Sequence, residues 1–394
     1  MARDVWILNG ARTPMAEYNG HFRGLTEVEL GTLAAKEAMV RSGVEPGRID
    51  HVIFGNALQT SGNAIYGARH VALKAGLPVE VPALTLNRLC GSGIQSILSA
   101  AHLIRLDEAR CVLAGGMENM SQAPHVIRGA RAGLRLGEGK LEDSLMVALL
   151  DSHCGMYMAQ TAEKIARERE ISRKEQDAFA LRSQQRAQAA VEAGRLKEEI
   201  VPVTIKEGRS ERVVTEDDHR RPETTLEGLA KLVPAFSKDG TVTAGNASGI
   251  VDGGAAVVVS SEPAVGSGRP LGRIVASGVA GVDPTIMGIG PVPATRMALR
   301  NAGLKLEEID LVEVNEAFAA QYLAVEKDLG LDRDRVNVNG GAIALGHPLG
   351  ATGTRLVLTL LLELRRRGGR YGLATACIGG GQGIAVIVES AVRG

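Results

Sequence analysis

The sequence predicts an α/β fold built from two similar α/β units with a longer insertion between them. Three observations carry this prediction. Strand-like and helix-like stretches alternate along the chain, the alternation occurs twice, and the segment between the two occurrences has a different composition. The chain has 394 residues, enough for two or three domain-sized units around a large core. Hydrophobic residues make up 45% and charged residues 23%, which is ordinary for a globular protein.

The first unit has clear local signals. Residues 26–42 show helical spacing, with Thr26 as a candidate N-cap and Gly43 at the stop. A turn is expected at residues 9–14, directly after the first strand, and a second strand pattern ends in Gly115-Gly116. Apolar runs predict strands at residues 5–8, 50–54, 81–86 and 111–114.

The second unit repeats this order. Ala38–Val44 resembles Ala298–Leu304, and both are followed at the same offset by Ile-Asp, at Ile49 and at Ile309. The next apolar run then recurs, with a buried helix expected at residues 356–364 and a strand at 371–376. Chance is the alternative explanation, but the order and the spacings agree, so we interpret the pattern as a duplicated α/β unit.

The insertion is richer in charge and in loop signals than either unit. Residues 142–150 and 158–193 show helical patterns, whereas 209–225 is polar and irregular. We expect an N-terminal unit at 1–120, completed by about 250–270, an inserted loop domain at 121–249, and a C-terminal unit at 271–394. Ligands of α/β folds bind at the carboxyl ends of the strands, so a lid or a binding role is expected for the insertion; a surface excursion with no ligand is the alternative.

Charge and cysteine usage exclude several classes of protein. Lys plus Arg and Asp plus Glu both number 45, so there is no basic field for a nucleic-acid partner, and aromatics at 3% offer no base-stacking platform. No apolar run is long enough for a membrane span or a signal peptide, so no membrane partner is expected. The four cysteines have neither metal-ligand spacing nor a disulfide pattern, so we expect no metal and a cytoplasmic location.

Cys90 lies where a predicted strand turns into a predicted helix, with glycines on both sides of Ser92. Glycines allow a close approach to the sulfur, and the positive end of the following helix would favour a thiolate. This is the environment of a nucleophilic cysteine. Taken alone, the stretch fits a buried structural cysteine better, because cysteine is among the most buried residue types.

Three further stretches have the same character. Asn315 ends a predicted strand, His347 lies among glycines before an apolar helix, and Cys377 ends another strand before three glycines. A lone histidine is usually structural. The triple glycine lacks the Lys-Ser/Thr of a Walker-type phosphate loop. Together, however, two Cys, one His and one Asn at strand ends suit acyl transfer through a thioester coupled to proton abstraction next to a carbonyl. A cysteine protease would need no second cysteine.

These stretches resemble the thiolase family (acetyl-CoA C-acetyltransferase and 3-ketoacyl-CoA thiolase) along essentially the whole chain. The resemblance implies a layered αβαβα arrangement of the duplicated units, and it favours a functional role for all four reactive side chains. Four long motifs occur in order: Asn87-Arg88-Leu89-Cys90-Gly91-Ser92-Gly93, Asn315-Glu316-Ala317-Phe318, Gly346-His347-Pro348 and Cys377-Ile378-Gly379-Gly380-Gly381-Gln382-Gly383.

The resemblance also implies roles. Cys90 attacks a thioester and carries the acyl group, while His347 accepts its proton. Cys377 removes or returns a proton at the α-carbon of acetyl-CoA. His347, with a water held by Asn315, would form one oxyanion hole, and the N–H groups of Cys90 and Gly379 would form the other. No metal or redox cofactor is implied. Coenzyme A and acyl-CoA are implied as substrates.

The insertion resembles the family's CoA-binding loop. Ser248 would contact the pantetheine arm, within a stretch that includes Ala244, and Met158 would lie in the acyl pocket, where Tyr157 and Ala159-Gln160 depart from the usual family pattern. The remaining candidates each have a plainer alternative. Arg221 would lie near the nucleotide of CoA, or it is a solvated surface residue. Phe236 and Phe318 would line the pocket, or they are core residues.

The expected activity is condensation of two acetyl-CoA, or thiolysis of short 3-ketoacyl-CoA. The rivals are a fatty-acid β-oxidation thiolase with a longer-chain preference, a CoA-binding scaffold without turnover, and a decarboxylating condensing enzyme, against which Cys377 speaks. Chain length would depend on packing near Met158, Met287 and Phe318. Residues 128–141 resemble a tetramerisation loop, so a homotetramer (a dimer of dimers) is expected. Cys111 and Cys154 are expected to be structural.

Overall fold

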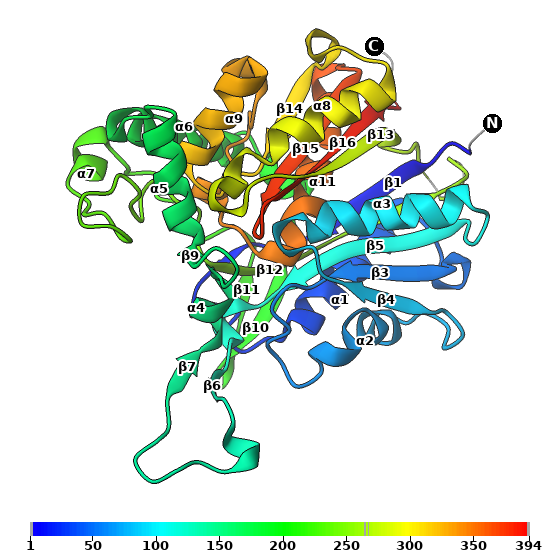
Figure 1. Cartoon of the computed structure of the whole chain (residues 1–394). Helices are drawn as coiled ribbons and strands as arrows, with labels where there is room; N and C mark the ends of the chain where they lie inside the picture. The colour runs from blue at the N-terminus through cyan, green and yellow to red at the C-terminus, as the bar shows by residue number, and fades with distance from the viewer. Residues whose placement is uncertain (1–2, 264, 267, 392–394) are drawn as a thin grey trace.

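The structure is a computed structural model that describes residues 3–263, 265–266 and 268–391. Its described residues form one ten-stranded mixed sheet in the order β14-β15-β16-β13-β1-β12-β5-β3-β4, with β2 paired to β12 (Figure 1). The strands of this sheet are β1 (Trp6–Arg12), β2 (Ala16–Glu17), β3 (His51–Gly55), β4 (Ala83–Leu86), β5 (Cys111–Glu118), β12 (Val251–Ser260), β13 (Gly272–Gly281), β14 (Leu311–Val314), β15 (Tyr371–Ile378) and β16 (Gln382–Ser390).

Helices lie on both faces of each half of the sheet, which confirms the predicted layered α/β fold. The central helices α3 and α11 pack on each other and on strands from both halves. Helices α1 and α2 cover the outer face of the N-terminal half, and α8 with α9 covers the outer face of the C-terminal half. Their bounds are α1 (Glu27–Ser42), α2 (Gly67–Lys74), α3 (Ser92–Arg105), α8 (Pro291–Ala302), α9 (Ala319–Leu329) and α11 (Leu349–Arg367).

The duplication is visible in the way the strands of the two units pair. Strand β3 pairs parallel with β5 and β14 pairs parallel with β15, while β5 and β15 each pair antiparallel with the next strand, β12 and β16. The start of each unit is fixed in the same way: Asp50 accepts hydrogen bonds from the N–H groups of Arg110 and Cys111, and Asp310 accepts them from Arg370 and Tyr371. The repeated Ile-Asp pair is therefore the point at which each unit joins its two parallel strands.

Two glycines lie inside strands where the sequence predicts a turn or a strand end. The turn expected at residues 9–14 is mostly strand, because Gly10 pairs with Val257 of β12. The strand expected to end at Gly115 continues to Glu118. There, a side chain at Gly116 would overlap the carbonyl of Gly350 at the start of α11. In both places the missing side chain allows close packing rather than a turn.

The predictions for α1 and α11 are confirmed. Thr26 caps α1 in a capping box with Glu29, and Gly43 ends it in the left-handed conformation. Helix α11 is buried from Leu349 to Leu364 between the two halves of the sheet. None of the helices in the described part of the chain is long and apolar enough to cross a membrane.

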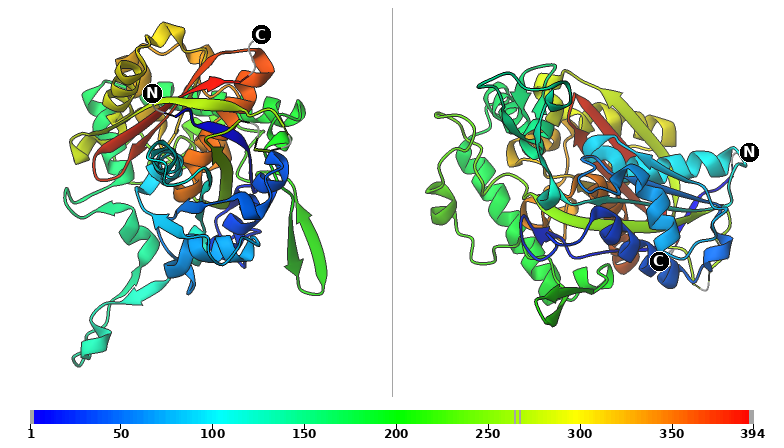
Figure 2. Two further views of the ribbon diagram at one scale, coloured as in Figure 1. Left: turned by 90° about the vertical axis from the view of Figure 1, so that its right-hand side faces the viewer. Right: turned by 90° about the horizontal axis from the view of Figure 1, so that it is seen from below.

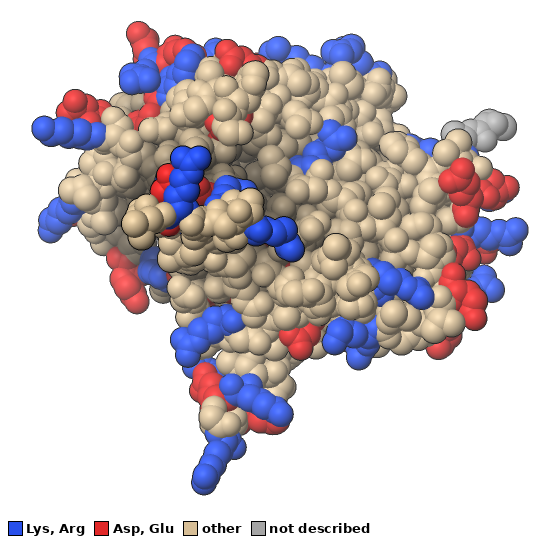
Figure 3. Space-filling view, turned by 60° about the horizontal axis from the view of Figure 1, so that its bottom comes forward, with Lys and Arg blue, Asp and Glu red and all other residues tan. Residues whose placement is uncertain are grey.

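The insertion contains more regular structure than its sequence indicated. The long helical pattern is broken after Glu168, and Ser172 caps a second helix, while the polar stretch contributes one strand, at residues 210–214, to a β-hairpin. The elements are β6 (His125–Ile127), β7 (Leu141–Asp143), α4 (Ser144–Ala148), β8 (Leu150–Asp151), β9 (Met156–Tyr157), α5 (Met158–Glu168), α6 (Arg173–Glu192), β10 (Val203–Glu207), β11 (Ser210–Val214) and α7 (Leu226–Ala230). The β6–β7 and β10–β11 hairpins project separately from the body (Figure 2). Positive and negative side chains are interspersed over the face drawn in Figure 3.

Candidate active site

An apolar cavity of about 400 Å³ lies between the insertion and the carboxyl ends of the strands. Its wall includes six of the residues predicted from the sequence, which are Met158, Phe236, Ala244, Ser248, Phe318 and His347. Cys90 packs against a cluster formed by Met120, Leu145 and Leu349, and two members of this cluster, Met120 and Leu349, line the cavity. The structure therefore brings the candidate nucleophile and the candidate CoA contacts to one place.

The backbone at Cys90 is a tight turn between β4 and α3. Leu89 has a φ of 45°, a left-handed conformation that a leucine rarely adopts and that re-aims the chain just before the cysteine. A side chain at Gly93 would overlap Gly353 of α11. The glycine-rich sequence thus allows α3 and α11 to start side by side, one after Cys90 and the other after His347.

The resting state of Cys90 differs from the sequence prediction. Cys90 is partly exposed as a residue, but desolvation of its thiol raises the pKa to about 11, against the lowering effect of hydrogen bonds from the backbone of Gly379 and of Cys90 itself. The charge of Glu118 raises the Cys90 pKa further. The expectation that the helix end favours a thiolate is therefore wrong for the resting site, because desolvation outweighs the backbone donors.

His347 is held as a neutral base. Burial, with the nearby charge of Arg355, lowers the pKa of His347 to about 3. Its Nδ1 lies 2.6 Å from Oγ1 of Thr352, whose own hydrogen is donated to the carbonyl of Pro348 at 3.0 Å. The hydroxyl can then only accept, so this hydrogen-bond network assigns the proton to Nδ1 and leaves Nε2 free to take a proton.

Asn315 lies on the Nε2 side of His347, with its Nδ2 at 3.3 Å, and its Oδ1 has no partner in the structure. The neighbouring Glu316 accepts hydrogen bonds from Ser183, Asn337 and the backbone of Ile343. Burial raises the pKa of Glu316. These contacts join the end of β14 to the segment that leads into His347, so Asn315 and His347 are positioned together.

Cys377 is fully buried at the end of β15 and packs with Met287, Met158 and Phe318. Burial raises its pKa well above the ordinary value, and negative charge on Cys90 raises it further, so the two sulfurs lie within reach of each other's charge. The three residues expected to influence chain length therefore surround the second cysteine. Gly379 lies beside Met158, whose sulfur a side chain there would contact.

The segment that carries Ser248 is bonded to the same elements. The N–H of Ser248 donates to the carbonyl of Ala317 at 3.0 Å, and the carbonyl of Gly249 accepts from the N–H of His347 at 2.9 Å. Tyr157 and Phe236 line the cavity with their ring centroids 6.3 Å apart. The departure from the family pattern at Tyr157 therefore lies in the cavity wall.

Arg221 is the predicted contact that the structure leaves outside the cavity wall. Its guanidinium donates to the carbonyls of residues 218–220 and to Glu17, and its side chain is 56% exposed. Glu17 and its second partner, His219, do line the cavity. Arg221 is thus one hydrogen bond removed from the cavity.

Sequence reasoning missed two residues of the site. Glu118 is fully buried and accepts hydrogen bonds from Asn56, Leu58 and Gly350, and Thr352 orients His347. Glu118 carried a usable signal, namely a charged residue at the end of an apolar strand. Thr352 carried none, because a threonine in an apolar helix is common. No group of three or more metal-ligating side chains occurs in the described ranges.

The comparisons with known proteins all point to one family. The model of the thiolase N-terminal domain matches residues 5–263, and that of the C-terminal domain matches residues 268–390. Two similar proteins are the mitochondrial 3-ketoacyl-CoA thiolase of Homo sapiens, 54% identical over 99% of both chains, and an acetyl-CoA acetyltransferase of Pseudomonas aeruginosa, 51% identical over 98% of both. A crystal structure of the human mitochondrial enzyme in complex with CoA superimposes with a TM-score of 0.96, at 55% identity over 99% of both chains.

The cytoplasmic location expected from cysteine usage is contradicted by these comparisons. Similar enzymes from Homo sapiens and Mus musculus are named as mitochondrial. Unpaired cysteines indicate only a reducing environment, and this criterion does not separate the cytoplasm from other reducing compartments.

The predicted fold and the acyltransferase class are confirmed, and both domain models match in order over nearly the whole chain. The chain belongs to the thiolase family.

Proposed function

We propose that this protein catalyses the reversible thiolase reaction, in which two acetyl-CoA condense to acetoacetyl-CoA plus CoA, or a short 3-ketoacyl-CoA is cleaved by CoA. One arrangement carries the proposal: the neutral His347 lines an apolar cavity, and Cys90 and Cys377 pack in clusters that include residues of its wall. Acyl transfer needs a nucleophile with a base, and carbon–carbon bond chemistry needs a second proton-transfer group. The proposed site contains both pairs.

In the thiolysis direction, Cys90 is the nucleophile. Its proton passes to Nε2 of His347 as the sulfur attacks the 3-keto carbonyl, because both groups are neutral at rest and the ion pair forms only during attack. The bond between the α-carbon and the 3-keto carbon breaks, which leaves an acyl group on Cys90 and the enolate of acetyl-CoA. The N–H groups of Cys90 and Gly379 are proposed to bind the oxyanion of this step.

Cys377 then protonates the enolate carbon. Its raised pKa keeps it a thiol, the form that donates a proton. After acetyl-CoA leaves, free CoA enters, gives its thiol proton to the Cys377 thiolate and attacks the acyl group. The new acyl-CoA departs as His347 returns the proton to Cys90. Each thiol thus ends the cycle as it began, and condensation follows the same steps in reverse.

The enolate oxygen needs its own donors. We propose that it is met by His347 and by a water that Asn315 holds. The unpartnered, buried Oδ1 of Asn315 supports this role, because a buried polar atom without a protein partner is usually bonded to an ordered water. The α-proton of a thioester is weakly acidic, so donors placed in advance account for much of the acceleration.

CoA and acyl-CoA are the proposed ligands of the cavity. The backbone of Ser248 is bonded to the strand end that carries the candidate catalytic residues, which supports a pantetheine contact there, with Ala244 beside it. Met158, Phe236 and Phe318 would enclose the acyl group. Arg221 is proposed to act at the nucleotide end, outside the cavity wall.

A longer-chain degradative 3-ketoacyl-CoA thiolase is the second candidate. The 54% identity to the human mitochondrial 3-ketoacyl-CoA thiolase favours it. The apolar wall of the cavity is compatible with either chain length, so the two candidates differ in substrate rather than in the proposed steps.

We also propose the homotetrameric assembly and the three-part division of the chain at residues 120, 249 and 270. Strand β4 lies at an end of the sheet and exposes Leu84, and the β6–β7 hairpin exposes Leu136 near its tip. An exposed apolar strand edge and a projecting apolar hairpin support pairing with further copies of the chain.

Thiolysis of acetoacetyl-CoA by free CoA, run beside a longer 3-ketoacyl-CoA, tests the function. Cleavage of the short substrate supports the first candidate, cleavage of only the longer one supports the second, and cleavage of neither by folded protein contradicts both. Cys90→Ser should abolish the acyl-enzyme, whereas Cys377→Ser should spare acylation of Cys90 and nearly eliminate condensation. Cys154→Ser, in the β8–β9 hairpin, is the matched control. Equal loss of both steps in Cys377→Ser would contradict the division of roles.

A further inference from the structure

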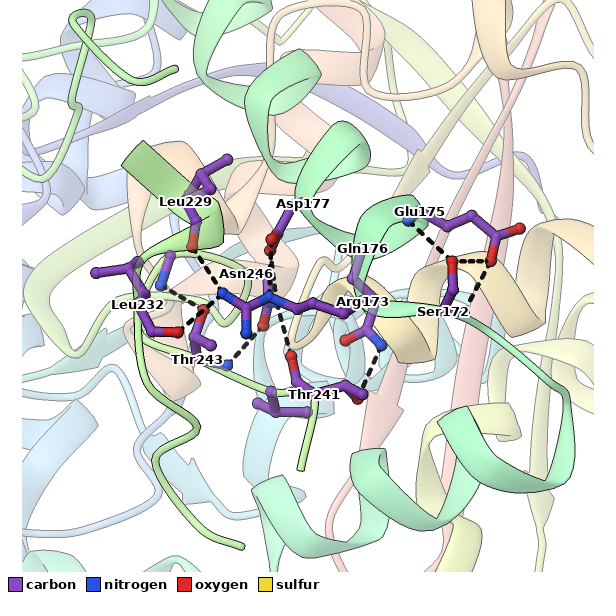
Figure 4. Close-up of polar contacts among 12 residues, drawn as sticks. Ser172, Arg173, Glu175, Gln176, Asp177, Leu229, Leu232, Thr241, Thr243 and Asn246 are labelled. Carbon is purple, nitrogen blue, oxygen red and sulfur yellow. Dashed lines mark hydrogen bonds and ion pairs between the residues drawn. The ribbon is translucent and has the colours of Figure 1, made fainter. Parts of the chain in front are cut away.

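The segment of residues 241–249 has two sides with different tasks. One side lines the cavity through Thr243, Ala244 and Ser248. The other side is bonded to α5 and α6, and Figure 4 shows these polar contacts around Asp177 and Asn246. The shape of the cavity wall therefore depends on residues that do not themselves line it.

Asp177 uses both of its carboxylate oxygens as a bridge. Oδ2 accepts from Nε of Arg173 at 2.7 Å, and Oδ1 accepts from Nδ2 of Asn246 at 3.0 Å. The side chain is almost completely buried, and its bond to Asn246 is made away from water, whereas the bond to Arg173 is partly buried. Arg173 also donates to the carbonyls of Leu229 and Leu232.

Asn246 occupies the other end of this bridge and is fully buried. Its Nδ2 also donates to the carbonyl of Thr241 at 3.0 Å, and its Oδ1 accepts from the N–H of Thr243 at 2.8 Å, so the side chain closes the turn on itself. Its carbonyl accepts from the N–H of Ala319, the first residue of α9. Asn246 thus joins the turn both to α6 and to the segment that follows Asn315.

Neighbouring contacts leave the turn little freedom. Glu163 of α5 accepts from the N–H groups of Thr241 and Val242, and Gln176 donates to the hydroxyl of Thr241. A side chain at Gly245 would overlap Leu229 and Leu232, the two residues whose carbonyls Arg173 holds. The turn is therefore clamped between α7 and α6, and the bond between Asp177 and Asn246 lies at the centre of the clamp.

We propose that Asp177 and Asn246 are positioning residues that hold the 241–249 segment in the shape that binds the pantetheine arm of CoA. The proposal rests on the proposed function of the cavity and extends it to two residues that do not touch the ligand. Loss of their mutual bond should weaken CoA binding without changing the reactivity of Cys90, because Cys90 is supported by other elements.

Isothermal titration of free CoA into the full chain tests this proposal. Asp177→Asn leaves one acceptor oxygen for two buried donors, and Asn246→Asp sets a second carboxylate against the first, so each should raise the Kd for CoA about tenfold. In the double variant Asp177→Asn, Asn246→Asp, the amide at 177 can donate to the carboxylate at 246 while its oxygen still accepts from Arg173. Its Kd should return part of the way toward the wild-type value, because the bond between residues 177 and 246 is restored while the carbonyl of Thr241 still lacks its donor.

Ser172→Ala is the matched control, because Ser172 caps the same helix without touching the 241–249 segment. It should lower the melting temperature and leave the Kd for CoA unchanged. Alkylation of Cys90 by iodoacetamide should proceed equally fast in all variants. If Asn246→Asp does not fold, Asn246→Ser takes its place, because it removes the bond to Asp177 without adding a charge. It should also raise the Kd for CoA.

Three outcomes would overturn the proposal. The single variants could bind CoA with the wild-type Kd, Ser172→Ala could raise the Kd for CoA as much as they do, or the double variant could bind CoA no more tightly than the single variants. The proposed function fails separately. A wild-type protein that binds CoA but cleaves no 3-ketoacyl-CoA contradicts the activity and leaves this test intact, whereas one that binds no CoA overturns both.

Discussion

A carboxylate oxygen of Glu118 accepts a hydrogen bond from the backbone N–H of Gly350 at 2.9 Å. Glu118 ends strand β5 of the N-terminal unit, and Gly350 lies in the first turn of α11 in the C-terminal unit, three residues after His347. The contact is fully buried. One side chain thus joins the end of β5 in the N-terminal unit to the helix α11 that follows His347.

Glu118→Gln should change how stability depends on pH. Burial raises the pKa of Glu118 from 4.5 to about 7, so between these values the native state binds more protons than the unfolded state. Its contribution to the free energy of unfolding is fully present below about pH 4.5 and is lost as pH rises through 7. The stability difference between wild type and variant should therefore shrink by up to about 3 kcal/mol from pH 4.5 to pH 8.

Urea unfolding of both proteins at several pH values measures this difference. Glu80→Gln, at an exposed position, should show a constant difference from wild type. Parallel pH profiles for wild type and Glu118→Gln would show that this carboxyl keeps the same pKa on unfolding.

Thr352→Val should lower kcat about tenfold, because the proton on Nδ1 of His347 would lose its acceptor inside the protein. Thr352→Ser keeps the hydroxyl and should stay close to wild type. Thr295→Val is the control, since that buried hydroxyl has no partner in the structure and lies on α8. Steady-state thiolysis gives kcat for each variant. Equal activity in Thr352→Val and Thr295→Val would mean that the tautomer is held by other contacts.

Alkylation of Cys90 in the free enzyme should report a thiol rather than an ion pair. With the pKa of Cys90 raised to about 11 and that of His347 lowered to about 3, the rate with iodoacetamide should rise about tenfold per pH unit from 7 to 9. Mass spectrometry of the modified protein gives the rate, with Cys90→Ser as the background for the other cysteines. A plateau between pH 6 and 8 would instead indicate a resting thiolate–imidazolium pair.

Met158→Ala should shift the substrate preference toward longer acyl chains. Met158 packs beside Cys377, Met287 and Phe318, so its removal opens space where the acyl group would lie. The ratio of kcat/KM for a longer 3-ketoacyl-CoA to that for acetoacetyl-CoA should rise about tenfold. Met146→Ala, at an exposed position of α4, should leave the ratio unchanged. A lower ratio in Met158→Ala would place the acyl group elsewhere.

The sequence was most informative where local chemistry decides the structure. The cap at Thr26, the stop at Gly43 and the repeated Ile-Asp pairs each depend on neighbouring residues, and all were recognisable. Glycines inside strands were misinterpreted, because the reason for Gly116 is a helix turn that lies far along the chain. Local pattern cannot reveal a partner that only the tertiary fold brings near.

For the site, residue types and order indicated the chemistry, but not the protonation states. The expected thiolate at Cys90 followed from the helix start, a local feature, whereas the observed pKa is set mainly by burial, which depends on the whole fold. Asp177 was missed because its partner Asn246 is distant in the sequence, and Thr352 was missed because a threonine in an apolar helix gives no local sign of its bond to His347.

The central layer also bears on how such a chain could have arisen. One of its two helices, α3, comes from the first unit and the other, α11, from the second, and each is covered by the other and by both halves of the sheet. A single ancestral unit would have left this helix face open to water, and burying it would have required a second, identical molecule. Joining the two units in one chain would have made that pairing permanent, and the two equivalent helix starts now follow different side chains, the proposed nucleophile Cys90 before α3 and its proposed base His347 before α11.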